Sequence, residues 1–163
     1  MASKSTLQTR ADDGEGGNLS LGRLGDFVGF RLRRVQNQLS RKFASATVDM
    51  GLRSGLFSSL AIISANPGIS QSELSAEVGL DKSVTVTIVD ELEKYGWAER
   101  RRAPDDRRRH ALFVTPEGNQ QLDRLFARME EVESAVLHQL TDAEHQTLNG
   151  LLDRMYEAVV REG

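Results

Sequence analysis

Residues 70–115 read SQSELSAEVGLDKSVTVTIVDELEKYGWAERRRAPDDRRRHALFVT, and they contain the clearest structural signals of the chain. It opens with Ser70-Gln71-Ser72-Glu73, a capping box in which a serine oxygen accepts from a backbone amide while the glutamate reaches back. Gly79 supplies a turn, and Asp81 is placed to cap a second helix that runs to about Tyr95. Two helices around a short glycine-containing turn predict a helix-turn-helix, whose second helix enters the major groove of DNA.

The second helix has two different faces. Its inward-facing residues recur at helical spacing: Thr85, Ile88, Val89 and Leu92. The other face carries short polar groups, a lysine and a valine: Lys82, Ser83, Val86, Thr87 and Asp90. Hydroxyl groups can contact either purine or pyrimidine edges, and an aliphatic group can touch a thymine methyl. This face is therefore suited to reading bases, although any solvent-facing helix shows such a pattern.

A hairpin is predicted next, with strands at residues 97–102 and 109–115 around a turn at 103–108. Six arginines lie in it against three acidic residues. Charge on a hairpin edge can simply resist aggregation. Arginines beside a recognition helix, however, also suit phosphates and a narrow minor groove. A basic patch attached to a helix-turn-helix is the expected footprint of a DNA-binding protein.

The hairpin resembles that of a known family. The winged helix-turn-helix of the multiple-antibiotic-resistance regulator (MarR) family is similar to three stretches here: Gly96-Trp97-Ala98-Glu99-Arg100, Pro104-Asp105-Asp106-Arg107-Arg108 and Leu112-Phe113-Val114-Thr115-Pro116-Glu117-Gly118. In that family the wing carries Asp-Arg-Arg, and the following apolar strand ends in Leu-Thr-x-x-Gly. The resemblance extends from about Leu24 to Val160. It is broken at Thr87, where the family commonly has an arginine.

The resemblance implies roles for residues of the wing. Arg108 would reach the minor groove, Asp106 would brace it by an ion pair, and Arg107 would contact phosphate. With the helix residues, the predicted DNA-binding set is Ser70, Gln71, Lys82, Ser83, Val86, Thr87, Arg107, Arg108 and Arg109. The resemblance also implies a homodimeric repressor on a palindromic operator of double-stranded DNA, which a small aromatic or phenolic acid or its thioester would release.

Long helices are predicted on either side of this region. Residues 1–20 are polar and glycine-rich, which predicts a flexible N-terminal tail. Apolar stripes then predict a helix over residues 20–46 and two helices over 117–161, which break at Thr141-Asp142. These helices carry more apolar surface than a helix-turn-helix can cover, so we expect them to pack against a second copy.

The predicted fold is mainly α with a small β-hairpin wing, which places it in the α+β class. We expect a single domain over residues 21–163. Within it, the winged helix-turn-helix would occupy about 52–116, and the dimerisation helices about 21–46 and 117–161.

Composition narrows the class of protein. The 163 residues contain no cysteine, which excludes disulfides, thiolate-zinc sites and a thiolate nucleophile. No run of about eighteen apolar residues and no signal-peptide core is present, so we expect a cytoplasmic protein without membrane contact, nucleoid-associated when bound. Residues 21–116 hold 15 Lys and Arg against 11 Asp and Glu, whereas 117–163 hold 4 against 10. This asymmetry is expected when residues 21–116 include the surface that meets DNA phosphates and residues 117–163 face solvent.

Catalysis is not predicted, and neither is a cofactor. The sequence contains no HExxH, glycine-rich phosphate loop, GxSxG or paired-carboxylate pocket. His138 and His145, with Glu144, could bind zinc, which keeps a metal-responsive regulator as one alternative. Histidines on amphipathic helices are mostly surface or packed residues, so no metal site is predicted. A winged-helix module that binds other proteins is the second alternative.

The resemblance also implies a small-molecule site between the dimerisation helices and the winged helix-turn-helix. The latter, about residues 52–116, is called the reading head below. Its candidate lining residues are Phe30 and Arg34 from the first helix and Phe57 and Ala61 from the second. Aromatic rings offer a flat apolar surface, and an arginine can pair with the carboxylate or phosphate of an aromatic acid or an aromatic-acyl coenzyme A. The same residues could equally be core phenylalanines and solvated arginines. A bound effector would favour dimers in which the spacing of the two reading heads no longer matches successive major grooves, so that the affinity for DNA falls.

Overall fold

The computed structural model describes residues 19–53, 55–102 and 110–161, and the chain divides into two units, residues 1–35 and 36–163. The first unit contains a 3-10 helix, Gly22–Asp26, and the first turns of α1 (Val28–Ala46). The helix predicted over residues 20–46 is therefore wrong at its start. Phe27 has an extended backbone between the two elements, and the nearby glycines lower helix propensity.

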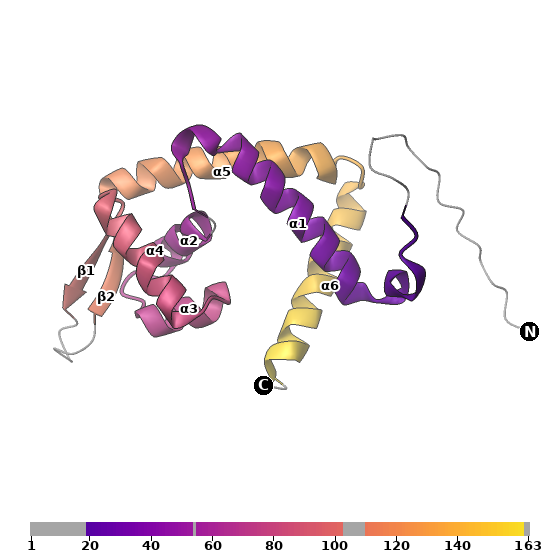
Figure 1. Cartoon of the computed structure of the whole chain (residues 1–163), viewed down its shortest axis with the longest axis horizontal. Helices are drawn as coiled ribbons and strands as arrows, with labels where there is room; N and C mark the ends of the chain where they lie inside the picture. The colour runs from indigo at the N-terminus through magenta and orange to yellow at the C-terminus, as the bar shows by residue number, and fades with distance from the viewer. Residues whose placement is uncertain (1–18, 54, 103–109, 162–163) are drawn as a thin grey trace, which may run out of the picture. The chain divides into compact units, whose positions relative to one another are not determined.

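The second unit begins within α1 and contains the reading head (Figure 1). After a 3-10 turn at Val48–Met50 its elements are α2 (Leu56–Ala65), α3 (Gln71–Val78), α4 (Lys82–Lys94), β1 (Ala98–Arg102), β2 (His110–Val114), α5 (Pro116–Leu137) and α6 (Asp142–Arg161). The strands pair antiparallel, from Ala98 opposite Val114 to Arg102 opposite His110. The predicted mainly α fold with a hairpin wing is confirmed.

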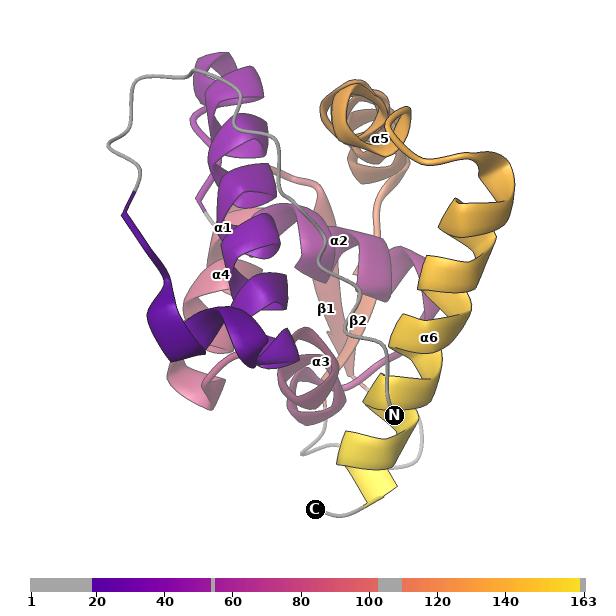
Figure 2. The same cartoon turned by 90° about the vertical axis from the view of Figure 1, so that its right-hand side faces the viewer.

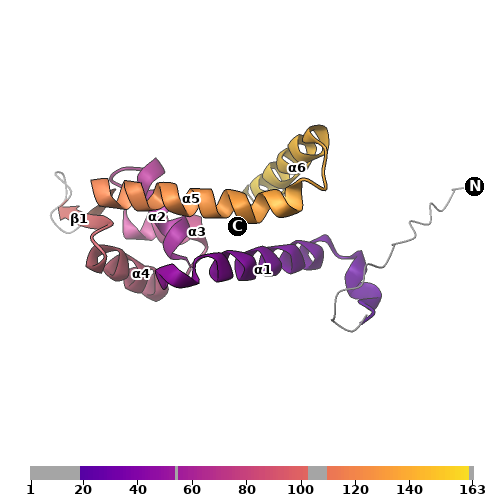
Figure 3. The ribbon, with the colours of Figure 1, turned by 90° about the horizontal axis from the view of Figure 1, so that it is seen from above.

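Helix α2 is the centre of the core, because it contacts α3, α4, α5 and β2 (Figure 2). Fully buried aliphatic side chains from all five elements meet here: Leu56, Leu60, Ile63, Leu74, Ile88, Val89, Leu92, Leu112 and Leu125. Helix α5 begins beside the hairpin and continues well beyond the head (Figure 3). The core thus fixes α3, α4 and the hairpin as one body.

A backbone connection between the α2–α3 turn and the hairpin was not predicted. The Gly68 N–H donates to the Leu112 carbonyl at 2.8 Å, and the Leu112 N–H donates to the Ile69 carbonyl at 2.9 Å. Ser70 and Ala111 consequently form a bridge at the edge of the sheet. The start of α3 is therefore tied to β2.

The joint between β2 and α5 explains the Thr-x-x-Gly pattern. The Thr115 hydroxyl donates to the Gly96 carbonyl at 2.6 Å and accepts from the Gly118 N–H at 2.9 Å. The Thr115 N–H donates to the Trp97 carbonyl at 3.0 Å. A Cβ atom on Gly118 would lie 1.9 Å from that same carbonyl oxygen, so only glycine fits. The Trp97 ring itself stacks on Tyr95, with 4.7 Å between centroids.

Helix α6 is an exposed element of the second unit. Within the described residues none of its side chains is buried. It exposes a row of large apolar side chains: Leu148, Leu151, Met155, Tyr156, Val159 and Val160. Among the described residues no helix combines the length and apolar character needed to cross a membrane.

The start of α6 carries a second capping box. The N–H and hydroxyl of Thr141 both donate to Glu144 at 2.8 Å, and the Thr141 hydroxyl accepts from the Glu144 N–H at 3.3 Å. The hydrogen bond from the Thr141 backbone, followed by that from its side chain, lowers the pKa of the Glu144 carboxyl. Because this pKa is lowered by folding, the stabilisation is present above the unfolded-state pKa and is lost as pH falls through the folded-state pKa.

Replacing Thr141 with alanine is expected to raise the pKa of Glu144 towards its ordinary value, because the side-chain hydrogen bond is lost. The pKa can be measured by following the Glu144 side-chain carboxyl resonance by NMR against pH. Thr147→Ala is the control, because the Thr147 hydroxyl donates to the Ala143 carbonyl and not to a carboxylate. A Glu144 pKa unchanged by Thr141→Ala, or raised equally by both substitutions, would contradict the assigned cap.

Candidate nucleic-acid interface

The turn between α3 and α4 is closed by Ser75. Gly79 has a φ of +69°, the left-handed conformation that the predicted turn requires. The Ser75 hydroxyl donates to the Leu80 carbonyl at 2.6 Å, and the Leu80 N–H donates to the Ser75 carbonyl at 3.1 Å. Asp81 stands at the predicted N-cap position with an extended backbone, but its side chain makes no capping hydrogen bond to the described residues. The prediction that its carboxylate caps α4 is wrong.

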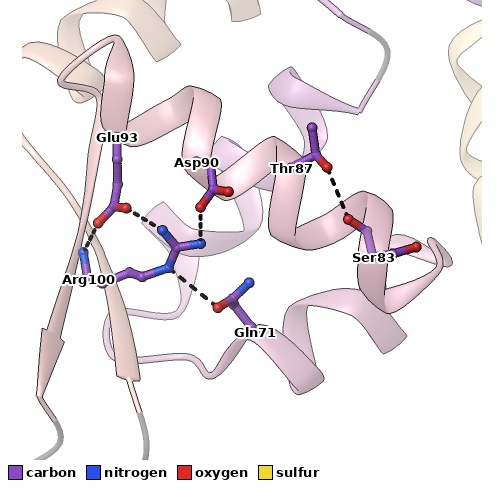
Figure 4. A network of polar contacts seen from close by, with 6 residues as sticks. All are labelled: Gln71, Ser83, Thr87, Asp90, Glu93 and Arg100. Carbon is purple, nitrogen blue, oxygen red and sulfur yellow. Dashed lines mark hydrogen bonds and ion pairs between the residues drawn. The ribbon is translucent and has the colours of Figure 1, made fainter.

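Helix α4 has the two faces that its period predicts. Thr85, Ile88, Val89 and Leu92 are its four buried residues. Lys82, Ser83, Val86 and Thr87 are exposed, and Val86 keeps 45% of its surface open to solvent. The Thr87 hydroxyl donates to the Ser83 carbonyl one turn earlier at 3.1 Å (Figure 4). A lysine, two hydroxyls and an aliphatic group therefore share one open face.

Ser70 and Gln71, also predicted to contact DNA, are already engaged within the fold. The Ser70 N–H and hydroxyl donate to Glu73 at 2.8 and 2.6 Å, which confirms the predicted capping box. Gln71 Oε1 accepts from Arg100 Nε at 3.4 Å. The Gln71 amide nitrogen is buried and has no hydrogen-bond partner among the described residues. Contact of either residue with DNA stays a prediction.

Arg100 joins three elements and was missed by the sequence analysis. Its guanidinium pairs with Asp90, with Nη2 to Oδ1 at 2.7 Å, and with Glu93, while its backbone N–H donates to Glu93 Oε1 at 2.8 Å (Figure 4). With Gln71 this links β1, α4 and α3. Strand alternation could have found it, because Arg100 lies two residues after buried Ala98 and so points to the same side of the strand.

The other arginines of the hairpin differ in how they are engaged. Arg101 pairs with Glu99 and lies over the Phe113 ring, 4.5 Å from its centroid. Arg102 is exposed. The remaining wing residues of the prediction lie outside the described residues: Asp106, Arg107, Arg108 and Arg109. The basic patch of the hairpin is thus partly neutralised, because Arg100 and Arg101 pair with carboxylates of the chain itself.

The four predicted ligand-lining residues fall in both units. Phe57 and Ala61 lie one turn apart on α2 and are half-buried. The Phe57 ring packs between Phe43 and Phe126, with centroid separations of 5.1 and 5.2 Å. In the first unit, Phe30 is half-buried and Arg34 is exposed. Phe57 thus belongs to an aromatic cluster whose Phe126 is partly open to solvent.

The two histidines proposed for zinc are on different helical segments. His138 follows α5, and its Nδ1 lies 2.6 Å from the Ser134 carbonyl oxygen. His145 lies on α6. In the parts of the chain that the structure describes, no three His, Asp or Glu residues are grouped so that they could hold a metal ion.

Comparison with known proteins adds four findings. The model of the MarR family matches residues 52–110. A putative transcriptional regulatory protein for the hcr operon of Thauera aromatica is 41% identical over 130 residues, which cover 79% of this chain and 78% of that protein. The transcriptional repressor CouR bound to a 23-mer DNA duplex has a TM-score of 0.74 and 28% identity, over 86% of this chain and 99% of that one. CouR from Rhodococcus jostii RHA1 bound to p-coumaroyl-CoA has a TM-score of 0.71 and 30% identity, over 81% and 93%.

Proposed function

This chain belongs to the MarR family of DNA-binding transcriptional regulators, which are not enzymes, and we propose that it is a homodimeric repressor. The dimer binds a palindromic operator and leaves it when a small aromatic acid or its coenzyme A thioester binds. The observation that carries the DNA-binding assignment is the open face of α4. That face lies on a head that resembles a repressor bound to a DNA duplex.

We propose that α4 enters the major groove and the wing contacts the backbone and minor groove. The residues proposed to contact DNA from α4 are Lys82, Ser83, Val86 and Thr87. From the wing they are Arg107, Arg108 and Arg109, with Asp106 bracing Arg108. Support comes from the exposure of the α4 residues and, for the wing, from the family's sequence pattern. Because α3, α4 and β1 are connected through Arg100 and Gln71, helix and wing would meet DNA in a fixed relation.

The proposal is tested by measuring binding to the DNA just upstream of the gene for this protein across a series of salt concentrations. Specific binding should be tight and should weaken steeply with salt, because phosphate contacts release counterions. A palindromic footprint would support the dimeric reader. Binding no tighter than to random DNA would count against this operator, and a selection from genomic fragments would then separate a distant operator from a protein-binding function.

Replacing Lys82 with alanine is expected to reduce the slope of log K against log salt by about one unit, because one phosphate-directed ammonium is removed. Lys42→Ala is the matched control, since Lys42 is also exposed but lies on α1. Its slope should equal that of the wild type. If both substitutions change the slope equally, or neither does, Lys82 does not contact phosphate.

We propose that the second copy covers α6. A 20-residue helix without a buried side chain in the described chain gains little from packing on its own subunit. Its exposed apolar side chains recur at i, i+3 and i+7, as in Leu148, Leu151 and Met155, which forms a stripe suited to another helix. A two-fold dimer would also place two α4 helices on the two halves of a palindrome.

The effector proposed is an aromatic acid or its thioester, bound where aromatic and basic side chains are available. Support comes from CouR, a structural relative that binds p-coumaroyl-CoA. It also comes from the cluster of Phe43, Phe57 and Phe126, which offers aromatic surface to a ring. We propose Phe57 and Ala61 as lining residues, whereas Phe30 and Arg34, which lie in the first unit, stay predictions from the sequence. Addition of p-coumaroyl-CoA to the operator complex, with coenzyme A alone as the control, tests for release.

A further inference from the structure

We infer that Arg100 is a positioning residue for DNA binding, which neutralises two carboxylates of the reading helix and holds them away from the DNA. The carboxylates are those of Asp90 and Glu93. This inference rests on the proposed function, since it concerns the same surface of α4.

All three side-chain nitrogens of Arg100 have partners within the protein. The side chain is only 18% exposed, and its Nη2, Nη1 and Nε atoms are directed to Asp90, Glu93 and Gln71 respectively (Figure 4). The backbone N–H adds a further hydrogen bond to Glu93. Because these contacts occupy the guanidinium, we expect Arg100 to neutralise the carboxylates of α4 and not to bind a phosphate.

The position of Asp90 on α4 explains why its negative charge has to be neutralised. It follows Thr87 by three residues and Ser83 by seven, so it lies on the same face of α4 as the residues proposed to contact DNA. Its side chain is 59% exposed. An unpaired carboxylate on this face would meet the phosphates as a like charge, which opposes binding. Arg100, which lies on β1 of the wing, supplies the opposite charge.

An arginine is required because of its shape. The planar guanidinium can address Asp90, Glu93 and Gln71 at once through a rigid fork, whereas a lysine ammonium is a single point charge on a flexible stem. The neighbouring pair, Arg101 with Glu99, is a contrast within the same strand. The Arg101 side chain is 58% exposed and its partner does not lie on α4, so it serves as the control.

The test is a thermodynamic cycle on DNA affinity. The DNA is a duplex that the wild-type protein selects from a random-sequence pool, compared with a shuffled duplex. Arg100→Gln is expected to weaken binding on the order of 10- to 100-fold, because the carboxylates are released. Adding Asp90→Asn and Glu93→Gln to that variant should restore most of the affinity. The same two amide substitutions in the wild-type background should raise affinity much less. Arg101→Gln should change affinity by less than about threefold.

Two results would overturn this role of Arg100, because the arginine would then act independently of the carboxylates. One is an equal gain in DNA affinity from the amide substitutions in both backgrounds, and the other is no rescue of Arg100→Gln. Circular dichroism checks that each variant is folded. If Arg100→Gln does not fold, Arg100→Lys replaces it and should still weaken binding several-fold, and wild-type affinity would overturn the inference. A wild-type protein that selects no duplex would overturn the proposed function itself.

Discussion

Replacing Gly118 with alanine is expected to lower the free energy of unfolding by about 3 kcal/mol or more, or to prevent folding of the winged unit altogether. The added Cβ would lie 1.9 Å from the Trp97 carbonyl oxygen and 2.8 Å from a methyl carbon of Val114. Neither neighbour is the free end of a flexible side chain. The backbone would have to separate, which would break the hydrogen bonds of Thr115 to Gly96 and Trp97. Denaturant unfolding of both proteins measures the difference.

The matched control is Gly150→Ala. Gly150 lies within α6, and a Cβ there would meet nothing within 4 Å in the described chain. Alanine has the higher helix propensity, so this variant should be more stable than the wild type by roughly 0.5–1 kcal/mol. If Gly118→Ala unfolds at the same denaturant concentration as the wild type, the close approach at the β2–α5 joint is wrong.

If the protein is the proposed dimer, replacing both Leu151 and Met155 with aspartate is expected to convert it to a monomer and to weaken operator binding by roughly 10²- to 10⁴-fold. The loss of affinity follows because a monomer engages one half-site and loses the high effective concentration of the second head. Sedimentation measures the mass of the particle, and titration of a labelled operator measures the affinity.

The control for this experiment adds the same charge elsewhere on the helix. Ala143 and Gln146 are exposed on α6 but lie off the apolar stripe. Ala143→Asp with Gln146→Asp should therefore remain dimeric and bind the operator. A double aspartate at 151 and 155 that stays dimeric would show that α6 does not form the interface, while leaving the DNA-binding proposal standing.

Local signals in the sequence predicted the reading head well. The capping box at Ser70, the turn at Gly79, the buried stripe of α4 and the two strands all depend on residues close together in the chain. Periodicity and turn chemistry report such neighbours directly. The start of α1 was predicted wrongly because the apolar stripe continues through Leu24 and Phe27, while the backbone there is a 3-10 turn followed by an extended residue.

Contacts between distant segments could not be predicted in the same way. The charge of Arg100 suggested phosphate, but its partners come from α3 and α4, and partner choice depends on tertiary packing. Phe57 was predicted to line a ligand site, yet nothing local showed that its ring meets those of Phe43 and Phe126. The wing residues Asp106, Arg107, Arg108 and Arg109 stay predictions.

The stacking of Trp97 on Tyr95 has a spectroscopic consequence. Trp97 is the single tryptophan of the chain, and it lies where α4 ends and β1 begins. Its emission therefore reports the winged head alone, without labelling, whereas far-ultraviolet dichroism averages over every helix. Recording both signals through one denaturation would show whether the head and the rest of the chain melt together, because non-coincident curves would reveal a populated intermediate.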